Sequence, residues 1–135
     1  MEKSKKVNYW AVLLATIVNF VFGFLWYSPK LFGEIWANAI GITLPDGAPP
    51  IGSILGSFIS TFLAMWGIAY VLKVLDKKGS KNGAIVSSFM SIFIILPNLI
   101  GQWFFAGKLN LFLTNFGIVF IGYIVCGMII GKLQK

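Results

Sequence analysis

The sequence has no histidine and no arginine, a single cysteine, and only four acidic residues in 135. Charged residues make up 11% of the chain, whereas a soluble domain has about 25%. This shortage excludes a soluble enzyme and a disordered chain. Because Cys126 is alone, an intrachain disulfide and a thiol-ligated metal cluster are excluded. Nucleic-acid readers rely on arginine, so we expect no nucleic-acid partner, and nothing in the composition calls for a metal or a cofactor.

Apolar residues are abundant instead and make up 58% of the chain. Four apolar runs reach the length of about 20 residues that a spanning helix needs. They cover residues 7–27, 51–75, 83–105 and 109–131. The first run is followed by no small-x-small cleavage site, so we expect it to remain in the membrane. The sequence predicts an all-α integral membrane protein with four transmembrane helices in a single domain, residues 1–135.

The connection between the first two runs contains a further short helix. Ser28 is a good N-cap and Pro29 a good first helical residue, and Gly41 could end the helix. Apolar residues recur at helical spacing between these limits, with Lys30 and Glu34 on the other side. The pattern predicts an amphipathic helix over residues 29–41 that lies in the membrane interface or re-enters the membrane.

Two residues should shape the later helices. Pro97 cannot donate a backbone hydrogen bond, so it should kink the third helix and free the Phe93 carbonyl. Gly79 follows two lysines and is expected to end the second helix.

The lysines are unevenly distributed between the apolar runs. Two of them, Lys30 and Lys108, fall on one predicted side of the membrane. The other nine fall on the opposite side: Lys3, Lys5, Lys6, Lys73, Lys77, Lys78, Lys81, Lys132 and Lys135. Because lysine-rich segments remain in the cytoplasm, this bias predicts a multi-pass protein of a bacterial-type plasma (inner) membrane with both termini cytoplasmic.

A motif follows the first apolar run. It reads WYSP-x-LFG-x-x-W and is preceded by Gly23. Its residues are Trp26, Tyr27, Ser28, Pro29, Phe32, Gly33 and Trp36. The motif resembles that of the domain-of-unknown-function 1761 family of small bacterial membrane proteins. The resemblance implies four membrane helices and no particular activity. Glu34 lies within the motif and either pairs with Lys30 or contacts a lipid headgroup or a cation.

The four runs contain no Asp, Glu, His or Arg, which argues against a proton-coupled carrier and against a redox enzyme. Their polar residues are neutral: Asn19, Ser57, Thr61, Asn98, Gln102 and Asn115. Helical rise places the three asparagines at a similar level, about 18–24 Å from the cytoplasmic ends of their helices. Either these residues join the helices by hydrogen bonds, or they line a polar cavity covered by segment 26–36.

Small residues form stripes at a spacing of four. One stripe contains Gly52, Gly56 and Ser60, and another contains Gly127 and Gly131. Such stripes let helix backbones approach closely. They serve packing within the protomer or an interface between subunits, and we expect a homo-oligomer.

The leading functional hypothesis is a non-enzymatic membrane protein that binds a lipid or a small neutral ligand, or associates with a partner membrane protein. The alternative is an oligomeric channel or facilitator lined by neutral polar residues. A lipid-modifying enzyme is third, because Glu34 and Asp46 in the connection have no partner for acid–base catalysis.

Overall fold

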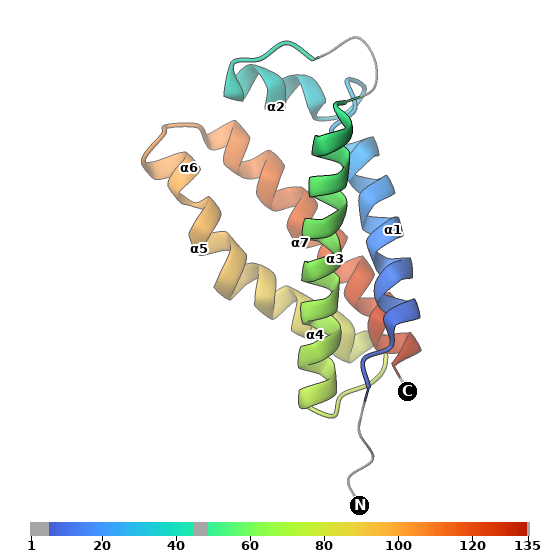
Figure 1. Ribbon diagram of the computed structural model, residues 1–135. Helices are drawn as coiled ribbons and strands as arrows, with labels where there is room; N and C mark the ends of the chain where they lie inside the picture. Colours follow the sequence, from blue (N-terminus) through green and yellow to red (C-terminus); the bar gives the residue numbers. More distant parts are fainter. Residues whose placement is uncertain (1–5, 45–48, 135) are drawn as a thin grey trace, which may run out of the picture.

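A computed structural model describes residues 6–44 and 49–134, and these residues form helices joined by short connections (Figure 1). Four helical stretches are long and apolar enough to cross a membrane. They are α1 (Tyr9–Trp26), α3 (Ile51–Val74), the composite third span (Ser80–Phe104) and α7 (Leu109–Leu133). A short helix, α2 (Gly33–Ile40), follows α1. The predicted all-helical fold with four membrane spans is confirmed.

The two ends of the bundle differ in what they carry. One end, called the terminal end below, holds the start of α1, the end of α7 and the connection from α3 to α4 (Figure 1). There the Asn8 side chain caps α1 by accepting from the Ala11 amide and donates a 2.8 Å hydrogen bond to the Leu133 carbonyl. The opposite end, called the α2 end, carries α2 and the hairpin between α6 and α7. Lys3, Lys5 and Lys135 lie outside the described residues.

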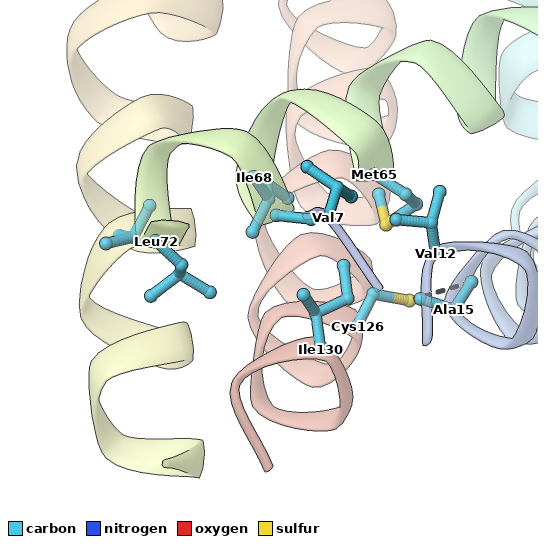
Figure 2. Packing of buried hydrophobic residues seen from close by; sticks show 10 residues of the cluster. Val7, Val12, Ala15, Met65, Ile68, Leu72, Cys126 and Ile130 are labelled. Carbon is cyan, nitrogen blue, oxygen red and sulfur yellow. Dashed lines mark hydrogen bonds between the residues drawn. The ribbon is translucent and has the colours of Figure 1, made fainter. Parts of the chain in front are cut away.

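The main apolar core lies in the half of the bundle nearest the terminal end (Figure 2). Met65, Ile68 and Leu72 of α3 are fully buried against α1 and α7. Cys126 belongs to this core, and its thiol donates to the Ala15 carbonyl at 3.3 Å. Tight packing at this end holds the four spans together and leaves the α2 end less densely packed.

Glycines let α4 (Ser80–Met90) and α7 approach backbone to backbone. A Cβ atom on Gly83 would overlap the Gly127 carbonyl, and one on Gly127 would overlap the Ser87 hydroxyl. A Cβ atom on Gly131 would overlap the Gly79 carbonyl, and the Gly79 amide donates to the Gly131 carbonyl at 2.7 Å. The Gly127 and Gly131 stripe therefore serves packing inside the protomer.

Two predicted helix ends were placed incorrectly. The α2 helix begins at Gly33, not at Pro29, because the amides of Leu31 and Gly33 both donate to the Ser28 carbonyl in a turn. Its predicted end at Gly41 is confirmed by a left-handed φ of 77°.

The second misplaced end is that of α3. This helix ends at Val74 with Leu75 as its C-cap, not at Gly79, because Asp76 adopts a φ of 52° and the Lys77 amide donates to the Leu72 carbonyl. These are the features of a Schellman motif at a helix C-terminus. Its left-handed position is usually glycine, and here it is Asp76. Gly79, with a φ of 89°, instead precedes α4.

The third span accommodates Pro97 through a wide turn. A π-helical segment, η1 (Ser91–Ile95), precedes the short helices α5 (Leu96–Leu99) and α6 (Gly101–Phe104). The Leu96 amide donates to the Ser91 carbonyl, five residues back. The predicted interruption at Pro97 is thus present as a π turn, a form common where a helix must absorb an irregularity.

Candidate site at the α2 end

The WYSP-x-LFG-x-x-W motif forms a compact corner between α1 and α2. The Trp26 ring lies 4.4 Å from the Phe32 ring, and the Tyr27 ring lies 5.3 Å from the Trp36 ring in an edge contact. Gly33 is buried beneath them, where a Cβ atom would overlap the Tyr27 carbonyl. Only glycine fits at this position, so the corner holds α2 across the end of the bundle (Figure 1).

Trp26 also attaches the end of α1 to α7. The Trp26 indole N–H donates to the Thr114 carbonyl at 3.1 Å. Its ring occupies a notch at Gly117, where a Cβ atom would lie 2.9 Å from the indole. Gly23, one turn earlier, makes an ordinary contact with Ile118. Sequence reasoning did not single out Thr114 or Gly117, because nothing local indicates which residues face a tryptophan 88 positions away.

Three side chains from three helical segments form a hydrogen-bonded chain, called the α2-end cluster below. The Tyr27 hydroxyl donates to Asn115 Oδ1 at 2.8 Å, and Asn115 Nδ2 donates to Gln102 Oε1 at 3.2 Å. Gln102 and Asn115 are half-buried. Gln102 Nε2 makes no hydrogen bond to the described residues. The chain therefore has a direction, and it ends in a free donor.

The protonation of Tyr27 maintains this direction. Tyr27 lies one residue beyond the end of α1, and burial raises the pKa of its phenol from 10.0 to about 12. The hydroxyl therefore keeps its proton at neutral pH. That proton makes the hydrogen bond to Asn115.

Two other asparagines predicted for the site, Asn98 of the third span and Asn19 of α1, lie apart from this cluster. Asn98 is exposed, and its amide donates to the carbonyl of Ile94 on its own helix. Asn19 is buried deeper, beside Gly122, with its Oδ1 unpaired among the described residues. The structure thus brings Asn115 and Gln102 together but does not place the three asparagines in one layer.

Asn19 borders a small apolar hollow between α1 and α7. The hollow has a volume of about 100 Å³ and is lined in part by Phe22, Gly122 and Cys126. A Cβ atom on Gly122 would overlap Asn19 Oδ1, so the absence of a side chain there gives the amide its room. The lining offers no exposed polar surface to a ligand.

The polar and small residues of α3 near the α2 end face away from the bundle. Gly52, Gly56, Ser57 and Ser60 are exposed, and Thr61 is half-buried. No atom of the described residues comes within 4 Å of a Cβ built on Gly52 or Gly56. Unlike the stripe on α7, this stripe packs against none of residues 6–44 and 49–134 outside its own helix.

Glu34, Lys30 and Pro29 are exposed, and Glu34 and Lys30 form no ion pair with each other. The i,i+4 pairing fails because Lys30 lies in the turn before α2 rather than on the helix. Asp46 lies outside the described residues. Glu34 is therefore an exposed carboxylate that forms no ion pair with another described residue.

The fold and this corner define a class: an all-helical, multi-pass membrane protein whose first helix is joined to a short amphipathic helix by an aromatic turn. The chain belongs to the family described as "Protein of unknown function (DUF1761)", whose sequence profile matches residues 10–131. A search of curated proteins and a search of solved structures each gave no significant match.

Proposed function

We propose that the protein binds a membrane lipid at the α2-end cluster and carries out no reaction on it. The observation that carries this proposal is the free Gln102 amide nitrogen at the end of the hydrogen-bonded chain. Aromatic residues lie next to Gln102 in the chain: Trp103 follows it, and the Trp103 ring stacks on Phe112 at 6.0 Å. A polar donor in apolar surroundings favours an amphiphile, because the head can meet the amide while the chains stay among apolar groups.

The side chains at this end support binding rather than catalysis. Glu34 is the one carboxylate that the described residues place near the α2 end, and it is exposed. The remaining groups of the cluster are a phenol and two amides, which bind and orient but do not exchange protons readily near neutral pH. A lipid-modifying enzyme is therefore the weaker proposal.

We place the protein in a bacterial-type plasma membrane with the terminal end in the cytoplasm and the α2 end outside. The lysines support this orientation: Lys30 and Lys108 lie at the α2 end, and the other six described lysines lie at the terminal end. Cysteines introduced at Lys108 and Lys132 test it in intact cells with a membrane-impermeant thiol reagent. Labelling at Lys108→Cys alone is expected, and labelling at Lys132→Cys alone would reverse the orientation.

Native mass spectrometry of the protein, released from mild detergent, tests lipid binding. Wild-type protein should carry a stoichiometric lipid mass, and Gln102→Leu and Asn115→Leu should lose it. Asn98→Leu is the matched control, since Asn98 lies one turn away and bonds only its own backbone. A wild-type protein without bound lipid, or a folded Gln102→Leu protein that retains it, would contradict the proposal.

A second candidate is a channel or facilitator in a homo-oligomer. It is favoured by the exposed Ser57 and Ser60 on α3, beside glycines that no protein atom covers. If several copies turned this face inward, neutral hydroxyls would line a pore. Solute flux into protein-containing liposomes, lost in Ser57→Leu, is the expected result for a channel. Absence of flux would leave this face to subunit contact or to a partner membrane protein.

A further inference from the structure

The donors and acceptors of the α2-end cluster are not balanced, and the imbalance specifies the ligand. The side-chain oxygen of Asn115 already accepts a hydrogen bond from Tyr27, and the side-chain oxygen of Gln102 accepts one from Asn115. What remains at the open end of the chain is the Gln102 amide nitrogen, which only donates. A group that pairs with this nitrogen must be an acceptor, and the preceding bonds polarise the amide toward it.

The backbone of Lys108 lies next to the backbone of Gln102. The Lys108 backbone amide donates to the Gln102 backbone carbonyl at 2.9 Å, where the chain turns from α6 into α7. Lys108 is exposed, so its flexible stem can bring the ammonium group to the same space. No acidic residue follows Asp76 in the sequence, so the hairpin contains no carboxylate that would neutralise this charge.

Apolar surface continues from the donors along the hairpin. Phe105 is 94% exposed and Phe104 67% exposed, and both directly follow the Gln102–Trp103 pair. Rings in this position are typical of the zone where lipid headgroups meet the hydrocarbon. A ligand held here would place an acceptor headgroup at Gln102 and Lys108 and its chains along the aromatic side chains.

We infer that the α2-end cluster binds the phosphate group of an anionic phospholipid, with Gln102 Nε2 and the Lys108 ammonium as its donors. The inference rests on the proposed lipid site and specifies its ligand. A phosphate offers several acceptor oxygens and a negative charge, and hydrogen bonds to a charged acceptor are about twice as strong as neutral ones. A lipid with only hydroxyl and ester groups would gain little from Lys108.

The test measures binding of three lipids with identical acyl chains to delipidated protein by native mass spectrometry. The lipids are phosphatidylglycerol, phosphatidylcholine and diacylglycerol. Phosphatidylglycerol should bind at least about tenfold more tightly than diacylglycerol, as charge-assisted hydrogen bonds imply. Equal binding of diacylglycerol would overturn the phosphate inference and leave the lipid site standing. Failure of all three lipids to bind would instead contradict the proposed function.

Three variants assign the donors. Lys108→Ala should weaken phosphatidylglycerol binding about fivefold, the value expected for one lysine near an anionic lipid. Lys30→Ala, the other lysine at this end, should change it less than about twofold. Gln102→Glu still accepts from Asn115 but presents a negative charge to the ligand. It should abolish phosphatidylglycerol binding and spare diacylglycerol, and unchanged phosphatidylglycerol binding would overturn the inference.

A final arm separates the lipid from free phosphate as the source of this chemistry. Excess inorganic phosphate is added to the phosphatidylglycerol complex. Retention of the lipid is expected, because the acyl chains contribute apolar contacts that a free ion lacks. Complete displacement would show that the site takes phosphate alone and would overturn its assignment to a phospholipid.

Discussion

The Tyr27 hydroxyl donates a 2.8 Å hydrogen bond to Asn115 Oδ1, across 88 positions of sequence. The same ring makes an edge contact with Trp36 of α2. One residue thus connects the amphipathic helix to the amide chain that ends at Gln102. The position of α2 and the geometry of the α2-end cluster are therefore coupled through Tyr27.

Replacing Tyr27 with phenylalanine should keep the ring contact with Trp36 and remove only the hydrogen bond. We expect a loss of about 0.5–1.5 kcal/mol in the free energy of unfolding, measured in detergent. Tyr70→Phe is the control, because Tyr70 is exposed and its ring stacks on Trp66 without the hydroxyl. An equal effect of both substitutions would show that the Tyr27 hydroxyl contributes nothing specific.

The difference in stability between wild type and Tyr27→Phe should depend on pH, because the pKa of Tyr27 is about 12 in the folded protein against 10.0 in the unfolded chain. A group whose pKa is raised on folding contributes stability below its unfolded pKa and loses it as the pH climbs toward the folded value. The gap between wild type and Tyr27→Phe should hold up to about pH 10 and shrink between pH 10 and 12. A gap that closes between pH 6 and 8 would contradict this assignment.

Two glycines with the same spacing pattern should respond in opposite ways to alanine. At Gly127 the new methyl group would overlap the Ser87 hydroxyl and the α4 backbone, so Gly127→Ala should cost about 1–3 kcal/mol or more. At Gly56 the methyl group meets no protein atom, and Gly56→Ala should leave the protomer equally or more stable. Thermal unfolding of both variants in one detergent decides the matter, and equal destabilisation would contradict the packing described.

These two glycines also show how far sequence reasoning reached. Apolar run length predicted the four helices well, because the thickness of a bilayer sets the length of a spanning helix. Residue spacing identified the stripes on α3 and α7 but could not tell which would be covered. That choice depends on where α4 crosses, and the crossing is set by Gly79 and Gly83, whose role becomes visible only in three dimensions.

The candidate site shows the same limit. Asn115 and Gln102 were both predicted as members of one set of six neutral polar residues, and the hairpin between α6 and α7 brings these two together. Asn98 and Gln102 are four residues apart, but the break at Ile100 lies between them, and Gln102 alone of the two joins the cluster. Nothing in the sequence indicates that the Tyr27 hydroxyl reaches Asn115.

Gly33→Ala tests whether the aromatic corner holds α2 in place. The added methyl group would overlap the Tyr27 carbonyl, so the corner should open and α2 should move away from the bundle. Ala37 of α2 is only 3% exposed, so a cysteine there reports on this movement. Labelling of Ala37→Cys by a thiol reagent should be faster in the Gly33→Ala background. Glu34→Ala, on the exposed side of α2, should leave the rate unchanged, and equal rates in all three proteins would contradict the role of the corner.

The uncovered stripe on α3 leads to a last prediction, about assembly. Gly52, Gly56 and Ser60 present a smooth strip to the surroundings, and a second copy of the chain could lay its own strip against it. Gly56→Leu would fill the groove of such a contact without touching the interior of the protomer. We expect native mass spectrometry to show wild-type oligomers and Gly56→Leu protomers that remain folded but separate.

Gly67→Leu, on the same helix next to Met90, controls for damage inside the protomer, since it should lower stability rather than change subunit number. Oligomers of unchanged size in Gly56→Leu would show that this strip faces lipid, and the small residues on it would then have to be explained by contact with lipid or with a partner membrane protein.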